Sequence, residues 1–145
     1  MYKVKKYNDY NKIIWIHGLP GSGKSTLAEK ISRENPSENY IILDDISDIK
    51  KLQIELEKGN NIILNSTYFE NYHEYGKYGE LKKLLSDYML EEVWFENDPK
   101  SCIENIRGRK NHSIDSISIL PEILYYSRSY EIPKGVKTIP VYKKS

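Results

Sequence analysis

The most chemically distinctive part of the sequence is the stretch GLPGSGKST, residues 18–26, which directly follows the apolar run KIIWIH at residues 12–17. It fits G-x-x-x-x-G-K-[ST], the pattern of a loop that binds phosphate groups, at every position. Glycines in such a loop allow backbone conformations closed to other residues and let amide N–H groups approach phosphate oxygens. A helix that starts at about Gly23 would also direct the positive end of its dipole into the loop.

The residue types in this loop predict a nucleoside triphosphate site. Lys24 is expected to reach the β- and γ-phosphates of ATP, and the Ser25 hydroxyl is expected to complete the coordination shell of Mg²⁺. The alternative is a glycine-rich turn with an incidental lysine, but a buried strand before the loop and helical spacing after it favour phosphate binding. The residues predicted to bind ATP are Gly18, Pro20, Gly21, Ser22, Gly23, Lys24, Ser25 and Thr26, with Ser25 as the metal ligand.

Two carboxylates, Asp44 and Asp45, follow the next apolar run, YIIL at residues 40–43. A carboxylate at a strand end beside the phosphate loop is placed to take a proton from an acceptor hydroxyl, which makes Asp44 the candidate general base. Either aspartate could instead cap the helix predicted to start near Ser47, an explanation that suits Asp45 better. The third apolar run, NIIL at residues 61–64, ends in NST without a carboxylate, unlike the strand that holds magnesium in switch- and motor-type triphosphatases.

Two arginines, Arg107 and Arg109, stand at the end of a predicted helix and open the polar stretch KNHSIDSIS at residues 110–118. Guanidinium groups can stabilise the negative charge that spreads over the equatorial oxygens during phosphoryl transfer. Basic residues also favour helix C-termini in general, but lysine would serve there equally, and only four of the 22 Lys and Arg residues are arginine. We therefore predict a short lid at about residues 107–120 that closes over the phosphates.

Apolar runs alternate with stretches of helical spacing along the whole chain. The predicted strands are residues 12–17, 40–43, 61–64, 91–96 and 136–142. This alternation favours a mostly parallel sheet with helices on both faces. We predict a three-layer α/β fold with five strands, forming a single domain over residues 1–145. Ligands bind at the carboxyl ends of the strands in such sheets, where the predicted site residues fall.

Helix boundaries are indicated by glycine and proline. Asn35-Pro36 should end the helix that follows the phosphate loop, and Gly59 should end the next one. Asp98-Pro99 should begin the helix that carries the lid arginines, because proline suits the first helical position. A further helix is expected from Pro121 to about residue 131.

Several other chemically interesting side chains are expected to be structural. His17, between the first strand and the loop, is interpreted as a packed or hydrogen-bonded residue and not as a catalyst. Tyr125, Tyr126 and Tyr130 are expected to pack on their helix, and Cys102 to fill a buried position.

Composition limits the protein class. The net charge of +1 gives no overall basic field for non-specific binding of nucleic acid. With one cysteine no internal disulfide can form, which favours a reducing compartment. No apolar run approaches the ~20 residues of a membrane span, and the N-terminal MYKVKKYNDY lacks the apolar core of a signal peptide. We therefore expect a cytoplasmic protein with no membrane partner.

The order of the segments resembles that of phage-type polynucleotide kinase domains and their small P-loop kinase relatives. The matching segments, from about residue 12 to residue 133, are IIWIHGLPGSGKSTLAEKI, IILDD, NIILNSTY, CIENIRGR and LPEILYYSRSYEIP. The resemblance implies that Lys24 and Ser25 bind ATP and magnesium, that Asp44 is the general base, and that Arg107 or Arg109 is the lid arginine. It also implies transfer of the γ-phosphate of ATP to the 5′-hydroxyl of DNA or RNA.

The chain departs from this family where the acceptor would bind. Ser47 stands where phage-type enzymes carry an arginine that grips the acceptor phosphate, and Ser66 stands where the family often carries an aspartate. Lys50 and Lys51 could substitute for the arginine, but an ammonium group lacks its bidentate fork. Two alternatives to a polynucleotide kinase therefore stay open: a kinase of a nucleoside, nucleotide or other small hydroxyl substrate, and a nucleotide-binding module without transferase activity.

Overall fold

A computed structural model describes residues 11–44, 49–66, 77–108 and 120–142 of the chain. They form a five-stranded sheet of order β2-β3-β1-β4-β5, in which every neighbouring pair is parallel. The strands are β1 (Lys12–His17), β2 (Ile41–Asp44), β3 (Ile62–Ser66), β4 (Met89–Phe95) and β5 (Lys137–Ile139). The predicted α/β fold is thus confirmed, with a sheet that is parallel throughout.

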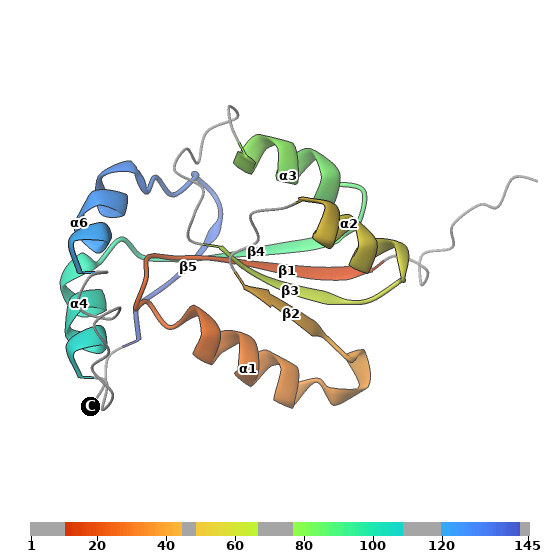
Figure 1. The fold of residues 1–145 in the computed structure, drawn as a ribbon, viewed down its shortest axis with the longest axis horizontal. Helices are drawn as coiled ribbons and strands as arrows, with labels where there is room; N and C mark the ends of the chain where they lie inside the picture. Colours follow the sequence, from red (N-terminus) through yellow and green to blue (C-terminus); the bar gives the residue numbers. More distant parts are fainter. Residues whose placement is uncertain (1–10, 45–48, 67–76, 109–119, 143–145) are drawn as a thin grey trace, which may run out of the picture.

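Helices flank both faces of this sheet (Figure 1). The helices are α1 (Lys24–Glu34), α2 (Ile49–Glu57), α3 (Lys77–Leu85), α4 (Pro99–Arg107) and α6 (Leu120–Ser129), with a short 3₁₀ turn, η2 (Pro36–Glu38). Helix α1 lies on one face, α2 and α3 lie on the other, and α4 and α6 lie together beyond the carboxyl ends of the central strands. No helix in the described ranges is long and apolar enough to cross a membrane.

Strand β1 is central because it is apolar on both sides. It pairs with β3 on one edge and β4 on the other, and Ile13, Trp15 and Ile16 are fully buried. A strand in the middle of a parallel sheet has helices over both faces, which is why a continuous apolar run predicts it. Because β1 is central, the loop that follows it lies at the middle of the sheet edge formed by the carboxyl ends of the strands.

Three of the predicted helix boundaries are confirmed. Helix α1 ends at Glu34, one residue before Asn35-Pro36, and Gly59 adopts φ +80° just after α2. The Asp98 carboxylate accepts the Ser101 N–H at 3.1 Å and so caps α4.

Other boundaries differ from the prediction. Strand β4 begins at Met89, two residues early, because the Met89 N–H donates to the Asn11 carbonyl at 3.0 Å and continues the pairing. Strand β5 ends at Ile139, since Pro140 has no N–H to donate to a ladder. The helix expected to reach residue 131 ends at residue 129. Packing is confirmed for the buried Tyr130 but wrong for Tyr125, which is 58% exposed.

Candidate active site

The loop between β1 and α1 uses glycine where other residues would be strained or would clash. Gly21 and Gly23 adopt φ values of +84° and +105°, a region that side-chain-bearing residues rarely adopt. A Cβ atom on Gly21 would lie 2.6 Å from the Cys102 carbonyl oxygen, and one on Gly23 would lie 2.9 Å from the Tyr142 Cβ. The loop is therefore pressed against α4 and against the segment that follows β5.

The N-terminus of α1 is arranged to receive an anion. Gly23 is the N-cap residue, so no side chain caps the first N–H groups, and no acidic residue lies in the first turn. These N–H groups carry the positive end of the helix dipole. Phosphate oxygens could therefore take the place of the missing cap.

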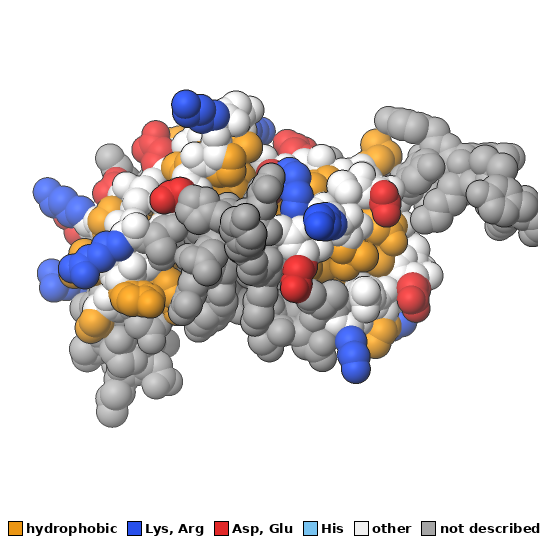
Figure 2. Space-filling view, turned by 90° about the horizontal axis from the view of Figure 1, so that it is seen from above, with side chains coloured by type: hydrophobic (Ala, Val, Ile, Leu, Met, Phe, Trp, Pro, Cys, Tyr) orange, Lys and Arg blue, Asp and Glu red, His pale blue; other side chains and the backbone are white. Residues whose placement is uncertain are grey.

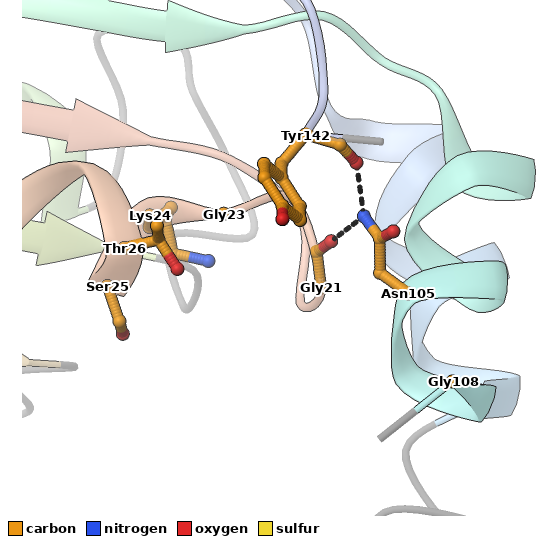
Figure 3. A pocket seen from close by; sticks show the side chains of 8 residues that line it. All are labelled: Gly21, Gly23, Lys24, Ser25, Thr26, Asn105, Gly108 and Tyr142. Carbon is orange, nitrogen blue, oxygen red and sulfur yellow. Dashed lines mark hydrogen bonds between the residues drawn. The ribbon is translucent and has the colours of Figure 1, made fainter. Parts of the chain in front are cut away.

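Side chains of the predicted loop line a pocket of about 300 Å³ (Figure 3). The lining residues from the loop and the start of α1 are Gly21, Gly23, Lys24, Ser25 and Thr26. Ser25 and Thr26 are exposed, whereas Lys24 is mostly buried and its Nζ donates to the Leu19 carbonyl at 3.1 Å. The other predicted residues, Gly18, Pro20 and Ser22, do not line it.

Three further lining residues were missed by the sequence interpretation: Asn105, Gly108 and Tyr142. Asn105 and Gly108 come from the end of α4, and Tyr142 comes from the segment after β5 and lies beside Gly21 and Gly23 in Figure 3. Asn105 and Gly108 do fall beside the predicted lid arginines, but nothing in the sequence indicates that Tyr142 lies against the loop.

Arg107 is the last residue of α4 and its side chain is exposed. Its neighbour Gly108 lines the pocket, so Arg107 stands at the pocket margin. Arg109 and the rest of the predicted lid up to residue 119 lie outside the described residues. The proposed pair of lid arginines is therefore placed only at Arg107.

Asp44 lies at the carboxyl end of β2, where its exposed side chain is held by a neighbour on β3. The two strands place Asp44 opposite Asn65, and the Asn65 Nδ2 donates to the Asp44 Oδ1 at 2.6 Å. Asn65 is 1% exposed, and its Oδ1 has no hydrogen-bond partner in the part of the chain that the structure describes. Asp45 and Ser47 fall outside that part, and the position of the Ser66 side chain is not described.

Behind the loop, a buried histidine confirms the packed, hydrogen-bonded interpretation of His17. Its Nε2 lies 3.1 Å from the Glu92 Oε1, and its ring stacks on Trp94 with centroids 3.8 Å apart. Burial lowers the pKa of His17 to about 4 despite the opposing bond to Glu92. Burial also acts to raise the pKa of Glu92, but hydrogen bonds from His17 and Lys82 outweigh it and bring that pKa to about 2. At neutral pH His17 is therefore uncharged.

The Tyr130 side chain connects the segment after α6 to the end of β1, next to the phosphate loop. Its hydroxyl lies within hydrogen-bond distance of the His17 carbonyl, at 3.3 Å, and of the Phe95 carbonyl. These two carbonyls belong to the last residues of β1 and β4. The strand end that leads into the loop is thus fixed by a side chain 113 positions away.

No protein-family model matches the chain, and no curated protein matches it. Among solved structures, a shikimate kinase from Bacteroides thetaiotaomicron is similar with a TM-score of 0.49 and 13% sequence identity, over 81% of this chain and 78% of that chain. The resemblance to phage-type polynucleotide kinases stays a prediction. The parallel sheet and the G-x-x-x-x-G-K-S loop between β1 and α1 have the arrangement of a P-loop NTPase fold.

Proposed function

We propose that this protein is an ATP-dependent kinase that transfers the γ-phosphate to a hydroxyl acceptor. The observation that carries the proposal is the pocket lined by the loop glycines, Lys24, Ser25, Tyr142 and the end of α4. The uncapped N-terminus of α1 and the Lys24 ammonium are both positive and adjacent, which suits a chain of phosphates. The nucleobase would then lie toward Tyr142, whose exposed ring offers a stacking surface.

The residues present fit a magnesium–nucleotide complex. Ser25 offers an exposed hydroxyl in the pocket, and the described residues contain no cluster of three or more His, Cys, Asp or Glu side chains that would hold a metal by themselves. Mg²⁺ bound with nucleotides takes few protein ligands and fills its shell with phosphate oxygens and water. The ion would supply neutralisation of the phosphate charge, with Ser25 as its protein ligand.

Asp44 is proposed as the general base. Because the Asn65 amide occupies the Asp44 Oδ1, the other carboxylate oxygen is left to accept the proton of the acceptor hydroxyl. The hydroxyl oxygen then forms a bond to the γ-phosphorus while the bond to the β–γ bridging oxygen breaks and ADP leaves. Arg107, at the pocket margin, would stabilise the charge on the transferred group.

A small hydroxyl-bearing metabolite is the acceptor that the charges favour. Polynucleotide affinity depends on several phosphate contacts from Lys and Arg. Figure 2 shows Lys and Arg side chains interspersed with Asp and Glu over the described part of one face, and no arginine occurs between Arg33 and Arg107. A polynucleotide 5′-hydroxyl is the second candidate, favoured by the ordered segments that resemble phage-type enzymes.

The test is phosphoryl transfer from γ-labelled ATP with magnesium. Nucleosides, nucleotides, other small alcohols and 5′-hydroxyl oligonucleotides would be offered in parallel, with Lys24→Ala as the inactive control. Label on a small acceptor supports the proposal, and label on the oligonucleotide supports the second candidate. Tight ATP binding without label on any acceptor would identify a nucleotide-binding module, and label released only as free phosphate would identify an ATPase. Either result would overturn the kinase assignment.

A further inference from the structure

Asn105 on α4 connects two segments that are distant in the sequence. Its Nδ2 donates to the Gly21 carbonyl at 2.9 Å and also to the Tyr142 carbonyl, as the dashed lines in Figure 3 show. The positions bridged are 84 and 37 residues from Asn105. Since an amide nitrogen has two hydrogens, both of its donors are used in these bonds.

A third bond closes this arrangement. The Tyr142 N–H donates to the Ser22 carbonyl at 3.0 Å, so the consecutive carbonyls of Gly21 and Ser22 are both bound from outside the loop. Tyr142 is thereby held through its own N–H and its own carbonyl. It lies beyond the last residue of β5, Ile139, so the strand ladder does not fix its backbone.

The consequence concerns where the Tyr142 ring stands relative to the phosphate loop. The loop and the start of α1 suit phosphates, and Tyr142, which is 53% exposed, lines the same pocket close beside Gly23. Because Asn105 bonds to both the loop and the Tyr142 carbonyl, it fixes the Tyr142 backbone beside the loop together with the bond from the Tyr142 N–H to Ser22. No charged group takes part in these contacts.

We infer that Asn105 is a positioning residue that sets the spacing between the phosphate subsite and the nucleobase subsite. The inference rests on the proposed nucleotide binding, but it does not require phosphoryl transfer. It assigns Asn105 a role in selecting a nucleotide over an inorganic polyphosphate. Loss of its amide should leave the loop able to bind phosphates while the ring loses its fixed position.

The test compares binding of Mg–ADP and Mg–pyrophosphate by isothermal titration calorimetry. Asn105→Ala removes both donors without weakening α4, because alanine is the best helix former. Two hydrogen bonds of ordinary strength predict about a 5- to 30-fold rise in Kd for ADP and less than about a 3-fold rise for pyrophosphate. Asn105→Leu, which has a similar shape but cannot donate and adds no charge, should do the same, and Glu104→Ala, an exposed change on the same helix, should alter neither Kd.

A double-mutant cycle tests whether Asn105 acts through the tyrosine. In a Tyr142→Ala background the ring is gone, so adding Asn105→Ala should change the ADP-to-pyrophosphate ratio of Kd by less than about 2-fold. Equal weakening of both ligands in Asn105→Ala, or full additivity with Tyr142→Ala, would overturn the positioning role and leave the proposed kinase standing. A wild-type protein that binds neither ADP nor pyrophosphate would overturn both the positioning role of Asn105 and the proposed kinase function. ADP binding without phosphoryl transfer would overturn the kinase function alone. Thermal unfolding of each variant would separate these outcomes from a loss of folded protein.

Discussion

The buried His17 makes the folding stability depend on pH in a window where few other groups titrate. The folded protein holds His17 neutral, with a pKa of about 4, whereas the unfolded chain protonates it near 6.5. Below pH 6.5 the unfolded state therefore binds a proton that the folded state does not. Stability that is fully present above pH 6.5 is lost as the pH falls toward 4.

The size of the effect follows from these two pKa values. The loss in unfolding free energy, relative to its plateau well above pH 6.5, is about 1.4 kcal/mol at pH 5.5 and about 2.6 kcal/mol at pH 4.5. Glu92, whose folded pKa is about 2, contributes with the same sign, but its stabilisation is lost only as the pH falls from 4.5 toward 2. The contribution of His17 can therefore be measured separately above about pH 5.

Urea unfolding followed by circular dichroism, at pH 7.5, 6.5, 5.5 and 4.5, would measure the contribution of His17 to the unfolding free energy. His17→Gln is the matched variant, because a glutamine amide is neutral throughout and can still donate to Glu92. The wild-type free energy should fall relative to that of the variant by the amounts given. Parallel pH profiles for the two proteins would refute the reasoning, since they would mean that His17 titrates alike when folded and unfolded.

Five other substitutions have defined outcomes. In steady-state assays with the identified acceptor, Asp44→Asn should lower kcat about 100-fold or more with KM for ATP nearly unchanged, and Asn65→Ala should lower kcat about 10-fold. Equal kcat values for wild type and Asp44→Asn would exclude Asp44 as the base. Gly21→Ala should abolish ADP binding in calorimetry, because the added Cβ would meet a carbonyl oxygen. Gly59 has a similar φ but no atom within 4 Å of the added Cβ, so Gly59→Ala should bind ADP normally and lower the unfolding free energy by only about 1 kcal/mol. Tyr130→Phe should lower the unfolding free energy by about 1 kcal/mol, and an unchanged urea midpoint would show that its hydroxyl bonds contribute nothing.

Local chemistry explains which parts of the fold could be predicted from the sequence. The phosphate loop, the Asp98 cap of α4 and the glycine after α2 each depend on residues within a few positions of one another. Their backbone preferences are set by those neighbours, so a pattern is enough to predict them. The continuous apolar run of β1 predicted a strand buried on both faces, because a central strand of a parallel sheet has both of its faces covered by helices.

The features that escaped prediction depend on partners far along the chain. The bond from Asn105 to the loop spans 84 positions, and the Tyr130 contact with the end of β1 spans 113. Such contacts follow from the strand order β2-β3-β1-β4-β5, which alternating elements alone do not specify. Asn65 was noticed only as a position without a carboxylate; its role as the partner of Asp44 required the register of β2 against β3.

Neutral groups from other elements hold the phosphate loop, in addition to the bond that Lys24 makes to the Leu19 carbonyl. The described contacts that fix it come from the Asn105 amide, the Tyr142 N–H and the Tyr130 hydroxyl on the preceding strand end. Lys24 is the only charged residue that lines the described pocket, and the first turn of α1 has no acidic side chain to offset the dipole. An anionic partner holding the loop would have competed with phosphate for the same charge. Because neutral bonds from α4 and from the segment after β5 hold the loop backbone, the loop can be ordered before an anion arrives.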